Sequence, residues 1–317
     1  MLATVWSYRE AMLDFAERGN IEVWTARLPA KEQEQRMSKV AGHQTQTVVK
    51  KAMHKALRHD SLNAFGRLIE EKNGELRFTS SPSLVVPVDE LLNQRERKRY
   101  VEVIGMLLEQ YREGLQPHLR AFAESYRFAP MARKVVRVGS VGTRDWAILL
   151  TGRDSCDPLL LQLKEATRSV LEPYAAKSRC ESQGRRVVEG QRFMQAASDS
   201  LLGWYRLRSF DGEMRDFYVR QLWDGRSSKD VPRLSASGLA TYGNACGWTL
   251  ARGHARSRDR IAIAAFLGED DAFDRAVVEY TSTYADVNEQ DRHRLVERST
   301  LAASGRRRGL TSSGDAV

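Results

Sequence analysis

Two glycines stand close together between two stretches of strand-like sequence. Gly139 and Gly142 follow Lys134-Val-Val-Arg-Val and precede Trp146-Ala-Ile-Leu-Leu. Glycines at such a turn let backbone N–H groups approach a phosphate, because no Cβ stands in the way. A strand rather than a helix follows, so this is neither a Walker loop nor a Rossmann turn. A hairpin with two glycines is also a common structural turn, and both interpretations stay open.

A lysine ends a strongly apolar strand, and a glutamate follows on the next predicted helix. Strand alternation over residues 159–164 puts the three odd-numbered leucines on one face, and Leu160, Gln162 and Lys164 on the other. Helical spacing puts Glu189 at the margin of an apolar face, where a carboxylate needs a cation. We therefore predict an ion pair between Lys164 and Glu189, within about 4 Å. The alternative is an edge lysine that extends into water.

The order of these features resembles the small lobe of protein-kinase-like folds: a glycine hairpin, a strand lysine, a helix glutamate, then a strand entering a hinge. By that resemblance the hairpin would cover the phosphates of ATP, Lys164 would contact them, and Glu189 would hold Lys164. Residues 221–224 would border the adenine. The resemblance thus implies a nucleotide site made of Gly139, Ser140, Gly142, Lys164, Glu189 and Gln221. Because kinase loops have three glycines and this one has two, a merely structural α+β lobe is the alternative.

Longer segments resemble a bacterial family known as domain of unknown function 2252. They include Lys134-Val-Val-Arg-Val-Gly-Ser-Val-Gly-Thr-Arg, Leu161-Gln-Leu-Lys-Glu-Ala, Arg186-Val-Val-Glu-Gly-Gln-Arg, Tyr218-Val-Arg-Gln-Leu and Cys246-Gly-Trp-Thr-Leu-Ala-Arg-Gly-His-Ala-Arg-Ser. The resemblance covers nearly the whole chain, up to about residue 300. The family has no established activity, and it is similar to kinases and small-molecule phosphotransferases.

The resemblance also implies that two motifs are missing. Full-length members carry Gly-Asp-Ala-His…Asn-Phe-Gly and Asp-Phe-Asp ahead of the matched region, similar to a catalytic loop and a metal-binding loop in permuted order. The sequence begins after both, so we expect an N-terminally truncated chain. Phosphoryl transfer depends on magnesium ligands and a residue that positions the nucleophile. We therefore expect ATP to bind weakly or not at all and hydrolysis to stay near background, with Mg²⁺ bound only in an active form.

Two acidic or histidine-containing segments could substitute for the missing groups. His254 and Asp259 lack a following asparagine, and we expect the histidine to be packed or at the surface. The acidic run 269–271 stands at a helix start, where carboxylates cap the helix. The alternatives are an active phosphotransferase completed by unrecognised residues or by a partner chain, a basic nucleic-acid-binding protein, and a fragment without function.

Positive charge is spread evenly along the chain. The 317 residues carry 50 Lys and Arg against 41 Asp and Glu, a formal charge of +9, and the pI is about 9.6. Residues 1–130 carry 20 basic and 17 acidic groups, residues 131–225 carry 16 and 12, and residues 226–317 carry 14 and 12. A nucleic-acid-binding protein usually concentrates its charge on one element, so the spread argues against that class.

Composition favours a soluble, cytoplasmic protein. Hydrophobic residues make up 42% and charged residues 29%, as in ordinary globular proteins. No uncharged apolar run approaches the roughly 18–20 residues of a membrane span, and charge near the N-terminus argues against a signal peptide. The three widely spaced cysteines fit a reducing compartment and offer neither a zinc site nor a disulfide framework.

Periodicity predicts an α+β fold in which an antiparallel sheet with one helix is flanked by helical regions. Helices are expected over 2–18, 31–59, 94–125, 185–201 and 235–302, with strands between 132 and 223 and a hairpin at Asn73-Gly74. The short connection between the first two strands excludes parallel pairing there. The expected regions are 1–128, mainly helical; 129–225, a nucleotide-binding lobe; 226–303, helical; and 304–317, a disordered tail.

Overall fold

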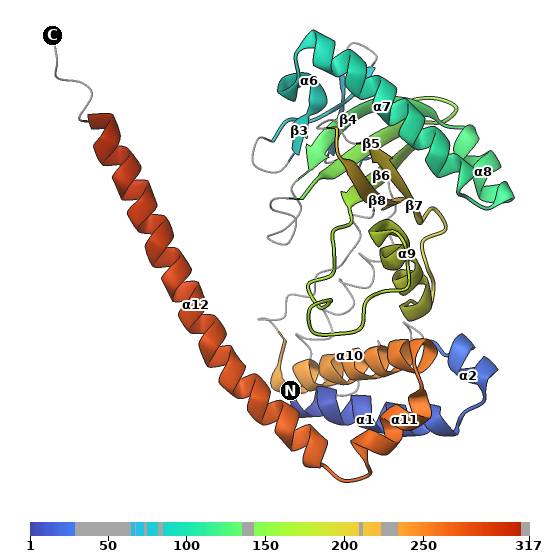
Figure 1. Ribbon diagram of the computed structural model, residues 1–317, viewed down its shortest axis with the longest axis vertical. Coiled ribbons are helices and arrows are strands. Elements are labelled where there is room, and N and C mark those ends of the chain that lie inside the picture. The colour runs from blue at the N-terminus through green and yellow to red at the C-terminus, as the bar shows by residue number, and fades with distance from the viewer. Residues whose placement is uncertain are drawn as a thin grey trace. The chain divides into compact units, whose positions relative to one another are not determined.

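The computed structural model describes residues 1–28, 65–66, 68–72, 75–81, 85–134, 143–208, 212–222 and 234–311 (Figure 1). The chain divides into two compact units. One unit comprises Met1–Arg36 and Ala236–Val317, and the other comprises Met37–Ser235. The first and last parts of the chain therefore fold together.

The first unit is helical. It contains α1 (Leu2–Glu17), α2 (Asn20–Thr25), α10 (Ala236–Ser257), α11 (Arg260–Leu267) and α12 (Ala272–Thr311). Helices α1 and α10 approach closely because Gly247 faces the Thr4 carbonyl oxygen, which a Cβ would overlap. Met12 and Phe15 are fully buried in the core beside them. A buried ion pair between Arg9 Nε and Asp274 Oδ2, at 3.2 Å, joins α1 to α12.

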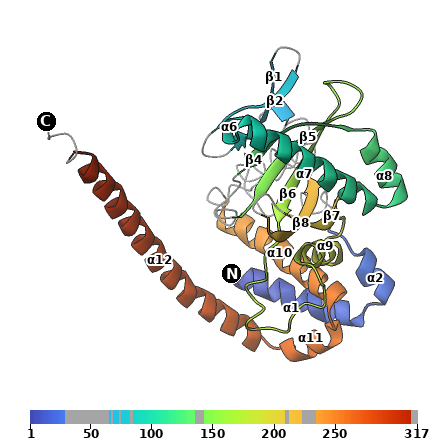
Figure 2. The same ribbon diagram turned by 45° about the horizontal axis from the view of Figure 1, so that its top comes forward.

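The second unit is built on a six-stranded antiparallel sheet of order β3-β4-β5-β6-β8-β7. Its strands are β3 (Val85–Pro87), β4 (Arg127–Lys134), β5 (Asp145–Thr151), β6 (Pro158–Glu165), β7 (Gly203–Arg208) and β8 (Met214–Gln221). A separate hairpin joins β1 (Ile69–Lys72) to β2 (Glu75–Phe78), and β2 packs against β4. Figure 2 shows this hairpin close to the short helix α6 (Val88–Leu91).

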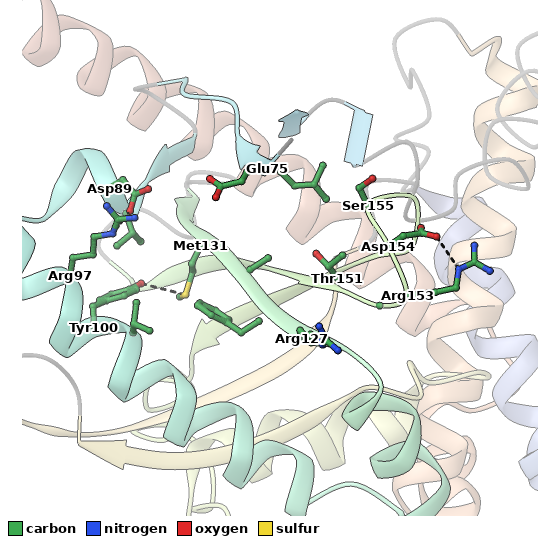
Figure 3. A pocket seen from close by; sticks show the side chains of 16 residues that line it. Glu75, Asp89, Arg97, Tyr100, Arg127, Met131, Thr151, Arg153, Asp154 and Ser155 are labelled. Carbon is green, nitrogen blue, oxygen red and sulfur yellow. Dashed lines mark hydrogen bonds and ion pairs between the residues drawn. The ribbon is translucent and has the colours of Figure 1, made fainter. Parts of the chain in front are cut away.

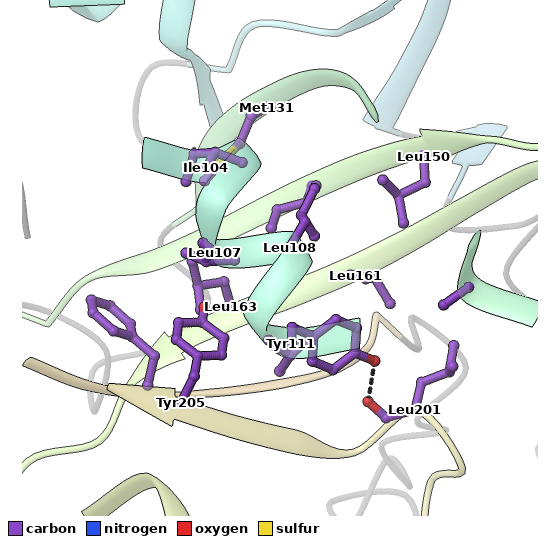
Figure 4. Packing of buried hydrophobic residues seen from close by; sticks show 14 of the residues in the cluster. Ile104, Leu107, Leu108, Tyr111, Met131, Leu150, Leu161, Leu163, Leu201 and Tyr205 are labelled. Atoms are coloured by element: carbon purple, nitrogen blue, oxygen red, sulfur yellow. Dashed lines mark hydrogen bonds between the residues drawn. The ribbon is translucent and has the colours of Figure 1, made fainter. Parts of the chain in front are cut away.

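One face of the sheet is covered by α7 (Gln94–Glu113), which α8 (Pro117–Glu124) follows. Helix α7 begins at a capping box, in which Asn93 accepts from the Glu96 backbone and the Glu96 side chain accepts from Asn93. Its buried residues recur at helical spacing: Tyr100, Ile104, Leu107, Leu108 and Tyr111. They pack on the odd-numbered leucines of β6 (Figure 4). The predicted alternation of β6 is confirmed.

The opposite face of the sheet carries α9 (Gln183–Met194) over β7 and β8. A Cβ on Gly184 would overlap the Phe217 carbonyl oxygen, so the helix lies directly on β8. The Arg185 guanidinium lies 6.0 Å from the centre of the Trp204 ring. Neighbouring residues of a strand point to opposite faces, and Tyr205 points to the face that α7 covers. Trp204, which contacts α9, therefore points to the other face.

The predicted α+β class with an antiparallel sheet is confirmed, and several element boundaries differ. Sequence patterns missed β3 and β7, and α9 ends at Met194 instead of residue 201. Helix α12 continues to Thr311, beyond the expected end near residue 302. The predicted helix 31–59 lies outside the described residues. The expected boundaries of the four regions stay predictions.

We predict that Gly184→Ala destabilises the chain by about 1–3 kcal/mol, because the new methyl group overlaps the backbone of β8. The matched variant is Gly190→Ala in the same helix, where a Cβ meets nothing within 4 Å. That variant should be neutral or stabilising by up to about 1 kcal/mol, from helix propensity alone. Urea denaturation followed by circular dichroism measures both. Equal effects of the two substitutions would contradict the close approach of α9 to β8.

Candidate functional site

Lys164 lies near the end of β6, directly opposite Asp145 on β5. Its Nζ is 3.2 Å from Asp145 Oδ2. The lysine side chain is 25% exposed, whereas the aspartate side chain is only 1% exposed. The ammonium group therefore neutralises a carboxylate that the sheet has removed from water, while its outer side still reaches solvent.

Gln162 extends this ion pair into a polar network across three strands. Its Nε2 donates to both carboxylate oxygens of Asp145, at 2.9 and 3.1 Å. Its Oε1 accepts from Arg220 Nε on β8, at 3.3 Å. Gln162 is itself 2% exposed, so the network satisfies polar groups that would otherwise be costly to bury. Alternation predicts that Gln162 and Lys164 share a face, but no sequence pattern pointed to Asp145.

A second charged cluster lies at the same end of the sheet. Glu165 accepts from Arg144 Nη1 at 3.2 Å and from Arg215 Nη1 at 3.1 Å. Its side chain is 8% exposed, and the two arginines are 34% and 26% exposed. Because Glu165 follows Lys164 directly in β6, this cluster lies on the opposite face of the sheet, that of the odd-numbered leucines. This end of the sheet is also where the segment between β4 and β5 begins and ends.

The predicted ion pair between Lys164 and Glu189 is wrong. Glu189 Oε1 instead accepts from Arg185 Nε at 2.7 Å, one turn earlier in α9. The Cys180 thiol donates to the other carboxylate oxygen at 3.4 Å. The hydrogen bond from Arg185 is the main cause of the lowered pKa of Glu189. Each charge has found a nearer partner, Glu189 at helical i−4 spacing and Lys164 on the neighbouring strand.

Gln221 lies on the other face of the sheet from Lys164. It pairs with Leu161 in the register, and its backbone N–H donates to Asp199 Oδ2 at 2.6 Å. Gln221 lines a cavity of about 460 Å³ with Leu159 and residues of α8. Gly139, Ser140 and Gly142 lie outside the described residues. Of the predicted site, the structure therefore places Lys164, Glu189 and Gln221, and the three side chains do not converge on one spot.

The segments considered as substitutes for a catalytic loop have structural partners. The Tyr8 hydroxyl lies 2.8 Å from His254 Nδ1, and Asp259 caps α11 by accepting from two backbone N–H groups. Asp270 likewise accepts from the Ala272 backbone N–H. Across the part of the chain that the structure describes, no three His, Cys, Asp or Glu side chains group to hold a metal. None of the helices searched within that part is long and apolar enough to cross a membrane.

Comparison with known proteins identifies the family. The model of the family described as "uncharacterized protein conserved in bacteria", DUF2252, matches residues 1–298. The match covers most of the chain, which therefore belongs to this family. No curated protein and no solved structure matched the chain.

We predict that Asp145→Asn destabilises the chain by about 1–3 kcal/mol. This is less than the roughly 3–5 kcal/mol for breaking a fully buried pair, because Lys164 reaches water. Glu75→Gln serves as the control, since it breaks the exposed pair with Arg77 and should cost less than about 1 kcal/mol. Urea denaturation measures both. Indistinguishable losses would show that the Asp145 pair contributes no more than a surface pair.

We also predict that stability falls as the pH is lowered through about 6.5, the ordinary pKa of histidine. Burial lowers the pKa of His254, so the unfolded chain takes up a proton that the folded chain resists. Stability is therefore lost on acidification. Melting temperatures between pH 8 and 5.5 should fall less for His254→Asn than for the unchanged chain. The variant His118→Asn, at an exposed position, should keep the full slope. An unchanged slope in His254→Asn would contradict the assignment.

Proposed function

We propose that the lobe spanning residues 127–222 binds a nucleotide, with ATP as the expected ligand. The observation that carries this proposal is Lys164, held by the buried carboxylate of Asp145 at the end of the sheet where β4 ends and β5 begins. The ammonium group of Lys164 pairs with Asp145 and is also partly exposed to solvent. It can therefore donate to a phosphate oxygen while it keeps its bond to Asp145. An ammonium group has three donors and can serve both.

The order of elements supports the proposal. Strands β4, β5 and β6 form a meander, the lysine stands on the third strand, and α9 follows with Glu189 before β7 and β8. This is the order of hairpin, strand lysine, helix glutamate and returning strands expected for a kinase-like small lobe. This similarity in the order of the elements supports a nucleotide as the class of ligand. It does not define the substrate of a phosphoryl transfer.

The charge at this end of the sheet also favours an anion. On the face of the sheet that carries Lys164, Lys164 and Arg220 carry two positive charges around Gln162, and Asp145 carries one negative charge. The surplus cation is the half-buried Arg220, and a guanidinium group binds phosphate well through paired N–H donors. A triphosphate would bring its charge to groups that are already oriented by Asp145 and Gln162.

Glu189 need not pair with Lys164 for this proposal. Asp145 performs the orienting role that the sequence had assigned to the helix glutamate, and it does so from the adjacent strand. The alternative within the same class is an active phosphotransferase, which would require metal ligands and a group that positions the acceptor.

We predict that ATP raises the melting temperature of the chain and that Lys164→Met weakens this binding at least tenfold by isothermal titration calorimetry. Lys177→Met, at an exposed lysine of the same unit, should bind ATP as before. The double variant Asp145→Asn/Lys164→Met removes both charges of the pair, so it leaves no buried charge without a partner. It should stay folded and should still lose affinity for ATP. Equal affinity in all four chains would overturn the proposal.

The same preparations decide between binding and turnover. We expect ATP hydrolysis near background with and without magnesium. Magnesium-dependent hydrolysis that disappears in Lys164→Met but persists in Lys177→Met would replace the binding proposal with an active phosphotransferase.

A further inference from the structure

A second cavity lies at the edge of the sheet where β3 stops. Strand β3 pairs only with residues 132–134 of β4, so residues 127–131 extend beyond it. A cavity of about 580 Å³ occupies this edge, lined from α7, from the β1–β2 hairpin and from residues 151–155, which include the end of β5 (Figure 3). This volume lies within the roughly 300–1,000 Å³ typical of small-molecule sites.

The lining of this cavity is largely apolar along β4 and α7. Met131 is 4% exposed and lies beside Tyr100, whose hydroxyl is 3.6 Å from the Met131 sulfur. Phe128 and Val101 are 36% and 46% exposed, although both are large hydrophobic residues. An apolar body entering here would remove these two side chains from water, and that burial would favour binding.

Three acids and three arginines line the cavity, and one of these arginines is left without an acid because Glu75 pairs with Arg77 outside the lining. Each lining acid has an arginine partner: Glu75 with Arg77 at 3.0 Å, Asp89 with Arg97 at 2.8 Å and Asp154 with Arg153 at 2.9 Å. Arg127, at the start of β4, also lines the cavity and has no ion-pair partner among the described residues. Figure 3 draws it between the Asp89–Arg97 pair and the Arg153–Asp154 pair.

We propose that this cavity binds a small organic carboxylate with an apolar body. The carboxylate would pair with the Arg127 guanidinium, whose parallel N–H donors match its two oxygens. The apolar body would lie against Phe128, Val101 and Met131. A single surplus arginine suits a single negative charge. A polyphosphate would bring several charges to a lining whose other two arginines already neutralise acids.

This site is separate from the proposed nucleotide site. Asp145 and Lys164 pair at one end of the β5–β6 hairpin, and Thr151 and Pro158 pair at the other. Six steps along the strand from Asp145 to Thr151, at about 3.3 Å each, separate the two ends by roughly 20 Å. Loss of one site therefore need not affect the other, and the two proposals can fail independently.

Calorimetric titration of the full chain with 4-phenylbutyrate and with its uncharged amide, 4-phenylbutyramide, tests the proposal. We expect the carboxylate to bind at least tenfold more tightly than the amide. Arg127→Ala should remove this difference and leave amide binding unchanged. Arg133→Ala, at an exposed arginine of the same strand outside the cavity lining, should behave as the unchanged chain does.

A second variant tests the cavity itself. Val101→Trp, at an exposed position of α7, would fill the cavity and should weaken the binding of both probes at least tenfold. Circular dichroism and thermal unfolding establish that each variant is folded. Equal affinity for the acid and the amide, equal behaviour of Arg127→Ala and Arg133→Ala, undiminished binding by Val101→Trp, or no binding of either probe would overturn the proposal.

Discussion

The buried carboxylate of Asp145 is the constraint on which the sheet of the second unit depends. A charge that is removed from water must be neutralised and hydrogen-bonded, and Lys164 and Gln162 do both from the neighbouring strand. The arrangement holds in one register only. A slip of one residue between β5 and β6 would turn Asp145 toward the leucine core beneath α7. The ion pair thus helps to fix the pairing that sets the position of Lys164.

The same constraint explains why the lysine could be predicted from sequence and its partner could not. Alternation of leucines over 159–163 fixes the face on which Lys164 lies, because that pattern is local. The choice between Asp145 and Glu189 depends on distances between elements, which no periodicity records. Arg185, four residues before Glu189, offered a competing partner that is visible in the sequence. That i,i+4 pair is local and competes directly with an ion pair to Lys164.

The missed elements have similar causes. Strand β3 is three residues long and ends at Pro87, so turn signals outweighed any strand pattern. Strand β7 alternates Trp204, Arg206 and Arg208 with Tyr205 and Leu207, so no run of aliphatic residues marks it as a strand. The joining of α1 to α10 and α12 is a contact between the two ends of the sequence. It rests on glycines and on the Arg9–Asp274 pair, neither of which has a local signature.

The two sites of the second unit differ in how their cations are balanced, and this difference sets what each can bind. Lys164 is oriented by a buried acid, so an added anion would share an ammonium group whose position is already fixed. Binding there gains from preorganisation and needs a further cation, which Arg220 supplies on the same face of the sheet. Arg127 has no such acid among the described residues, and the neighbouring surface is apolar. A ligand there must supply both the countercharge and the hydrophobic body, which a phosphate-rich molecule lacks. One sheet can therefore carry two anion sites that select different molecules.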